Sequence, residues 1–68
     1  MPVTEAREIL AVVAARLADA GIDTSQLDAR LLLATALQRD EAVLPHETLD
    51  RWTADEAARL DGFVERRI

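Results

Sequence analysis

The sequence has no cysteine, tyrosine, lysine or asparagine, and it has only two glycines and two prolines among its 68 residues. Without cysteine, neither a disulfide framework nor a thiolate metal site can stabilise the chain. With one Phe and one Trp, it has no aromatic platform on which single-stranded nucleic acid stacks. Neither glycine opens a strand–turn–helix unit, which excludes a glycine-rich phosphate loop.

Positive charge is also scarce, because eight arginines stand against thirteen acids and the net charge is -5. Nucleic acid and anionic membranes are bound by a basic surface, so we expect neither as the main partner. No apolar run approaches the roughly 20 residues that span a bilayer, and no N-terminal segment has the pattern of a signal peptide. We therefore expect a cytoplasmic protein.

The length of 68 residues allows a single small domain, residues 1–68. Alanine and leucine together supply about a third of the chain, and strong helix formers in this proportion indicate an all-α domain. No strand is evident. The sequence predicts a small compact helical bundle of three longer helices plus one or two short ones.

The first helix is predicted from Thr4 to about Ala20, with Thr4 as its N-cap and Gly21 at the C′ position. Its apolar residues recur at three- and four-residue steps and form one face: Ala6, Ile9, Leu10, Val13, Leu17 and Ala20. This periodicity is typical of an amphipathic helix that covers a core.

The second helix is predicted from an N-cap at Ser25 to Leu37, with Asp28 completing an imperfect capping box. Leucines and alanines cover most of its circumference, and the stripe of Leu27 and Leu31 is widened by several neighbours. A helix that is apolar nearly all round is usually the buried central one.

The stretch from Gln38 to Trp52 has a weaker pattern. Asp40 is suited to cap a short helix over residues 41–44, which Pro45 would end. Residues 46–52 form either a further helical turn or an ordered loop.

The last helix is predicted from the capping box of Thr53 and Glu56 to about Arg67. Its inner stripe contains Ala57, Leu60 and Val64, with Phe63 beside them. Gly62 in its interior suggests close packing or a kink, because glycine there costs about 1 kcal/mol relative to alanine.

Catalytic machinery is not evident in these residues. His46 is the only histidine, and no nucleophile with an orienting acid accompanies it, as general base catalysis would require. The acidic pairs at residues 40–41 and 55–56 stand at predicted helix starts, where the helix dipole stabilises them, and lack the pattern of a calcium loop. We expect no catalytic, cofactor-binding or metal-binding residue.

Two residues allow more than one interpretation. Ser25 follows Asp23 and Thr24 before a leucine-rich helix, which resembles the Asp-Ser-Leu site of acyl carrier proteins, but Thr24 and Gln26 interrupt that triplet and N-capping explains Ser25. Trp52 precedes a helix cap, where a hydrophobic staple or core contact is common, and tryptophan is also enriched in protein interfaces.

Three pieces of the sequence, in order, resemble the N-terminal domain of the HemK/PrmC family of release factor glutamine methyltransferases. They are Gly21–Ala34 with its Leu-Asp-Ala-x-Leu-Leu-Leu-Ala core, Arg39 followed by Leu-Pro-His-Glu at 44–47, and Leu60 with the Arg66–Arg67 pair. The order and the spacing of the three pieces extend over most of the chain, from residue 21 to residue 67.

This resemblance implies a substrate-recognition domain that catalyses nothing by itself. Family members use S-adenosylmethionine to methylate the Gly-Gly-Gln glutamine of class 1 peptide chain release factors, through an Asn-Pro-Pro-Tyr motif in a separate methyltransferase domain. The chain has no asparagine, so it does not contain the Asn-Pro-Pro-Tyr motif. From the resemblance we therefore expect the catalytic domain, with its cofactor, to follow in cis.

The implied partner is the release factor, and the domain alone is expected to be a monomer. Arg39 and His46 match the family's loop pattern and, with Trp52, are the candidate partner contacts; arginine pairing within the domain is the alternative for Arg39. A different class of function stays open, namely a free-standing helical adaptor whose leucine-rich helix docks a partner helix.

Overall fold

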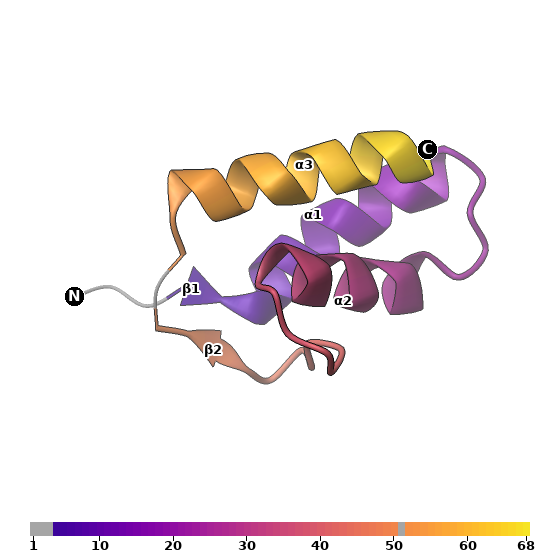
Figure 1. The fold of residues 1–68 in the computed structure, drawn as a ribbon. Helices are drawn as coiled ribbons and strands as arrows, with labels where there is room; N and C mark the ends of the chain where they lie inside the picture. Colours follow the sequence, from indigo (N-terminus) through magenta and orange to yellow (C-terminus); the bar gives the residue numbers. More distant parts are fainter. Residues whose placement is uncertain (1–3, 51) are drawn as a thin grey trace.

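The computed structural model describes residues 4–50 and 52–68. In chain order, its elements are β1 (Thr4–Glu5), α1 (Ala6–Asp19), α2 (Ser25–Ala36), β2 (Thr48–Leu49) and α3 (Ala54–Arg67). Figure 1 shows α3 along the top of the view, running in roughly the same direction as α1 and above α2, with β1 and β2 beside the start of α1. The predicted small bundle of three longer helices is confirmed.

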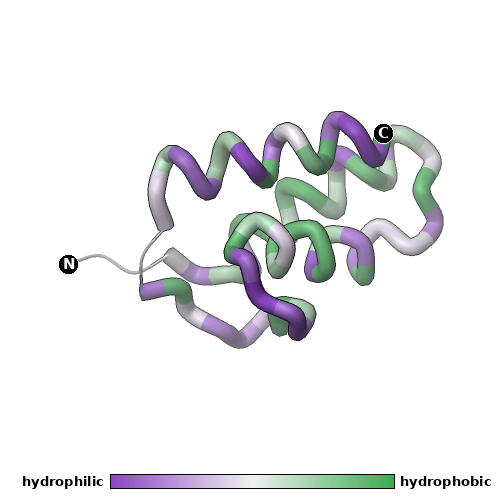
Figure 2. Tube along the Cα trace, viewed as in Figure 1, coloured by the Kyte–Doolittle hydropathy of each residue, from purple (hydrophilic) through white to green (hydrophobic). Residues whose placement is uncertain are grey.

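The core lies between the three helices, and each of them supplies part of it. The largest side chains with almost no exposed surface come from all three helices and from the loop after α2: Leu17, Leu33, Val43 and Val64. Full burial of a side chain of this size contributes about 1.5–3 kcal/mol to stability. Figure 2 shows that the loop after α2 begins with hydrophilic residues and then turns apolar. Val43 in this loop is fully buried and anchors the loop to the core.

Helix α2 is central, because it packs against both α1 and α3. Its predicted burial on most of its circumference is wrong, however, because Leu27 and Leu31 are each 45% exposed. The buried face of α2 is built from smaller residues instead, namely Ala29, Ala34 and Ala36 around Leu33. Small residues let the neighbouring elements approach closely, and the two leucines are left on the outward face.

Two predicted N-caps are wrong, and a different contact explains each case. Thr4 and Glu5 are extended and pair with Leu49 and Thr48, so α1 begins only at Ala6. In α2 the N-cap position belongs to Thr24, whose carbonyl accepts the Asp28 N–H at 2.9 Å. Ser25 is therefore already inside the helix, and neither N-cap residue forms a side-chain capping bond.

The C-terminal ends of α1 and α2 have the same geometry. After α1, Gly21 has φ +86° and donates to Ala18 O at 2.9 Å, while Ile22 donates to Leu17 O at 3.1 Å. This pair of bonds is a Schellman motif, with glycine at the predicted C′ position. Gln38 occupies the equivalent position after α2 with φ 61°, and the next residue, Arg39, donates its N–H to Ala34 O at 3.0 Å.

The segment between α2 and α3 differs from its prediction. Residues 41–44 form no helix, and β2 pairs with β1 in a two-stranded antiparallel sheet that the sequence pattern did not indicate. Strands of two residues are too short to produce a detectable alternation. The backbone groups of this segment bond to the helices instead of to each other. Val43 N–H donates to Arg30 O of α2 at 3.3 Å, and Glu47 O accepts the Ala6 N–H of α1 at 3.0 Å.

Helix α3 begins as predicted. The Thr53 hydroxyl accepts the Glu56 N–H at 3.2 Å, and the Glu56 carboxylate accepts the Thr53 N–H at 2.9 Å, which completes the capping box. At the other end, Arg67 pairs with Asp28 at 3.0 Å and joins the end of α3 to the first turn of α2.

Close packing does not explain Gly62, because a Cβ built there meets only the Arg66 guanidinium, at 3.9 Å. We therefore expect Gly62→Ala to stabilise the domain by about 0.5–1 kcal/mol in urea unfolding, since alanine loses less backbone entropy. Gly21→Ala is the matched opposite, because φ +86° is strained for a residue with a Cβ, by roughly 1–2 kcal/mol. A loss of stability in the Gly62 variant would contradict this account.

Candidate protein-binding surface

Arg39 organises the loop after α2. Its two terminal guanidinium nitrogens reach the two carboxylate oxygens of Glu47 at 2.8 and 3.1 Å. Its Nε donates to Glu41 O at 3.0 Å, and Nη2 also lies 3.4 Å from Ala42 O. The guanidinium thus holds backbone carbonyls at residues 41 and 42 in a non-helical arrangement, which explains why no helix forms there.

Glu47 closes a tight turn, Leu44–Glu47. The Glu47 N–H donates to Leu44 O at 3.1 Å, and the Glu47 carboxylate accepts the Leu44 N–H at 2.7 Å. Pro45 occupies the second position of this turn, where its fixed φ is favoured. The turn and the Arg39–Glu47 ion pair therefore form one connected unit.

The ion pair is about two-thirds covered, because the Arg39 side chain is 33% exposed and that of Glu47 is 25% exposed. The hydrogen bonds from Arg39 and then from the Leu44 N–H lower the pKa of Glu47 from 4.5 to about 2. The same bond to Glu47 raises the pKa of Arg39. Both groups are therefore held in their charged forms.

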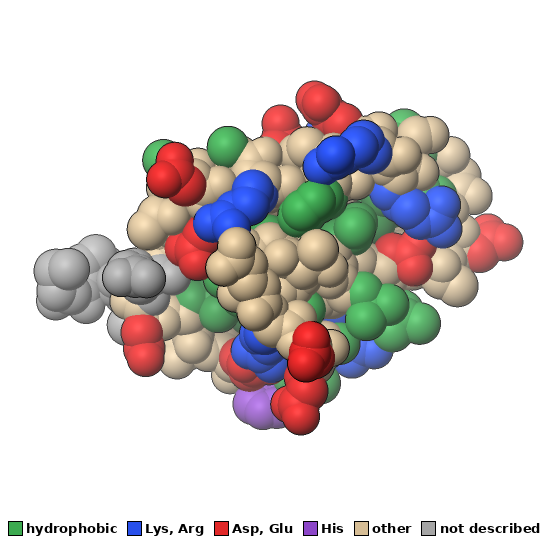
Figure 3. Space-filling model, in the orientation of Figure 1, with side chains coloured by type: hydrophobic (Ala, Val, Ile, Leu, Met, Phe, Trp, Pro, Cys, Tyr) green, Lys and Arg blue, Asp and Glu red, His purple; other side chains and the backbone are tan. Residues whose placement is uncertain are grey.

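His46 lies at the tip of this turn and is exposed. Figure 3 shows its side chain projecting from the edge of the molecule, beside acidic groups. The structure thus brings two of the predicted contact residues into one loop, with Arg39 supporting the turn from within and His46 displayed on it.

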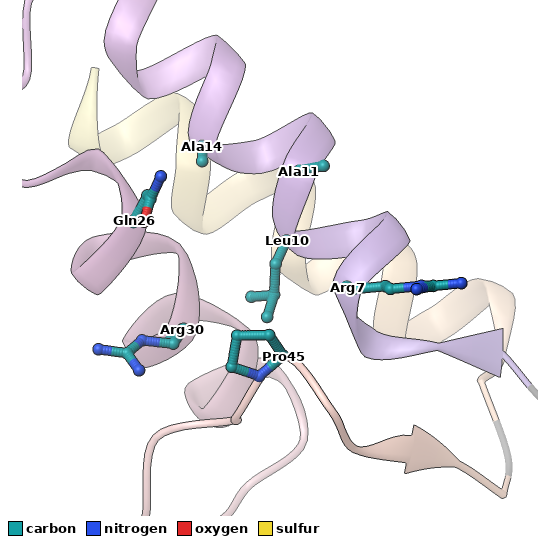
Figure 4. Close-up of a pocket in the computed structure, with 7 residues that line it drawn as sticks. All are labelled: Arg7, Leu10, Ala11, Ala14, Gln26, Arg30 and Pro45. Carbon is teal, nitrogen blue, oxygen red and sulfur yellow. The ribbon is translucent and has the colours of Figure 1, made fainter.

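A groove runs along α1 and α2 next to the same turn, and it encloses about 290 Å³. Pro45 of the turn meets Leu10 of α1 in its middle, with Ala14 on its wall (Figure 4). Two arginines flank this apolar floor on opposite sides, Arg7 from α1 and Arg30 from α2.

Trp52 lies elsewhere, in a hollow between α1 and α3. It is half-buried and packs against the core, and residues such as Ile9, Val13 and Ala57 line the same hollow. This agrees with the predicted core or staple contact, and a partner contact by Trp52 stays a prediction. The three candidate residues therefore do not form a single site, because Trp52 belongs to a different face from the loop.

Within residues 4–50 and 52–68, no group of three or more His, Asp and Glu side chains is placed to hold a metal ion. None of the helices in the described part of the chain is long and apolar enough to cross a membrane. The surface features of the described residues are the groove between α1 and α2, the hollow around Trp52 and the exposed turn at residues 44–47.

Comparison with known families identifies the domain. A family model described as the PrmC N-terminal domain matches residues 8–68. The chain belongs to the PrmC N-terminal domain family. This confirms the resemblance carried by the second helix and by the Arg39 and Leu-Pro-His-Glu elements, and the match extends through α3. Comparison with curated proteins and with solved structures finds no match.

Two residues that shape this surface of the PrmC-type domain were not identified from the sequence. Glu47 has no signal of its own in the sequence, because only the turn at residues 44–47 brings it back to Arg39. Arg30 has no such signal either, because its place beside the groove depends on how α1 packs on α2.

The Glu47 carboxylate provides a test by pH. Because its pKa falls from 4.5 to about 2 on folding, its contribution to stability is complete above pH 4.5 and is lost as the pH falls toward 2. We expect Glu47→Gln to be less stable than wild type at pH 7, with the difference shrinking toward zero near pH 2. Thermal unfolding of both proteins between pH 2 and 7 measures this, and a pH-independent difference would contradict it.

Proposed function

We propose that this chain is the release-factor-recognition domain of a protein-(glutamine-N5) methyltransferase. The observation that carries the proposal is the family match over residues 8–68. In this function the domain binds a class 1 peptide chain release factor and holds its Gly-Gly-Gln glutamine beside a catalytic domain in cis.

The proposal divides the work between two domains. The methyltransferase domain supplies S-adenosylmethionine and the chemistry, so this domain acts in the cytoplasm as a monomeric binding unit without a cofactor of its own. Its displayed turn and its grooves support such a role, because they combine apolar floors with charged rims. Apolar centres with polar rims are common in protein interfaces.

An NMR titration of the ¹⁵N-labelled chain with its cognate release factor tests the proposal. We expect localised amide shift changes on one face, including the turn at residues 44–47, and none with S-adenosylmethionine alone. An unchanged spectrum at high release factor concentration would overturn the proposal, and S-adenosylmethionine binding would contradict the division of work.

One observation favours the second candidate, a helical adaptor that docks a partner helix. Leu27 and Leu31 are one turn apart on α2 and are both 45% exposed. Leucines at positions i and i+4 are typical anchors for a helix in a groove.

Sedimentation velocity distinguishes the two candidates. The adaptor function predicts self-association through the exposed leucines, because an exposed apolar patch tends to be covered by another molecule. The recognition function predicts a monomer whose mass is independent of concentration. Leu27→Gln with Leu31→Gln is the matched variant, and it would abolish association only if those leucines cause it.

A further inference from the structure

Arg30 differs from the other arginines of the described chain. Arg7, Arg16, Arg39 and Arg67 each pair with an acid, and Arg66 lies over the Phe63 ring at 5.0 Å. Arg30 forms no ion pair among the described residues, although it is half-buried and its Nε is shielded from water without a hydrogen-bond partner. Arg59 also lacks an ion pair there, but it is exposed to water.

This environment prepares Arg30 for an external acid. Because its stem is packed against the protein, the side chain has less freedom to lose when a ligand binds. Its terminal nitrogens face outward at the end of the groove (Figure 4) and match a planar carboxylate in a bidentate geometry. Pairing with a carboxylate gains more free energy for a partly desolvated, unpaired guanidinium than for an exposed one.

The groove beside Arg30 adds a second element of recognition. Leu10, Ala14 and Pro45 form an apolar floor, and Gln26 lies one helical turn before Arg30 on α2 with its amide beside the groove. A volume of about 290 Å³ suits one or two amino-acid side chains. The combination therefore fits an apolar side chain next to an acidic one.

We propose that the groove between α1 and α2 receives an acidic–apolar segment of the class 1 release factor, with Arg30 holding the carboxylate. This inference rests on the proposed function and names the surface and the chemistry that carry it out. A protein segment is favoured over nucleic acid because the whole chain has a net charge of -5, which repels a continuous phosphate backbone and leaves only local attraction for a single carboxylate.

Binding of the release factor to Arg30→Gln and to wild type tests this inference. We expect the Kd to rise about tenfold for Arg30→Gln, which corresponds to about 1.4 kcal/mol. Arg59→Gln is the matched control, since it removes the same charge from an exposed position on α3, and its Kd should change less than twofold. In wild type the shift changes should include Leu10, Ala14 and Gln26, and raising the salt from 50 to 300 mM should weaken binding more than in Arg30→Gln.

Arg30→Lys is a second variant, for the case that the glutamine variant does not fold. It retains the positive charge and loses only the planar guanidinium that binds a carboxylate through two hydrogen bonds. It should bind with an intermediate Kd. Equal affinities of Arg30→Gln and Arg59→Gln, or shift changes confined to the hollow around Trp52, would overturn the inference and leave the proposed function standing. A release factor that does not bind wild type would overturn both, and groove shifts produced by an RNA oligonucleotide instead would overturn the acidic-segment assignment.

Discussion

The ion pair between Arg39 and Glu47 is the interaction on which the shape of the candidate binding surface depends. It joins the end of α2 to the turn at residues 44–47, and the Glu47 carbonyl in turn accepts the first N–H of α1. Through these contacts one guanidinium fixes the path of a loop that has almost no regular structure. Because Pro45 of this turn lines the groove against Leu10, the shape of that groove depends on the same pair.

The helices were largely predictable because their signals are local. The capping box at Thr53 and the glycine at position 21 act within a few residues, and both are where the pattern indicated. The errors arise where a distant segment competes. Thr4 pairs with Leu49 in a strand, and Val43 is held outside a helix because its N–H donates to Arg30 O in α2. Propensity alone does not contain these tertiary contacts.

The candidate site was predictable only in part, for the same reason. The Arg39 and His46 pattern points to the loop after α2, and the two residues do share that loop, but the ion-pair partner of Arg39 is evident only when the turn brings Glu47 back to it. Arg30 could not be singled out, since its half-buried and unpaired state depends on the packing of α1 against α2. Four of the seven arginines in the described part of the chain pair with acids inside the domain, so a half-buried one without an acidic partner there is informative.

Amide hydrogen exchange measures most directly whether the loop after α2 depends on the Arg39–Glu47 ion pair. The comparison is between wild type and Arg39→Met, which removes the guanidinium and keeps an apolar side chain. The account predicts faster exchange at the Leu44 and Ala6 amides, whose acceptors belong to Glu47, with the amides of Leu33 and Val64 in the helical core unchanged. Local opening of this kind is separable from global unfolding by its confinement to one segment. Unchanged exchange at Leu44 and Ala6, or equal acceleration throughout the domain, would contradict it.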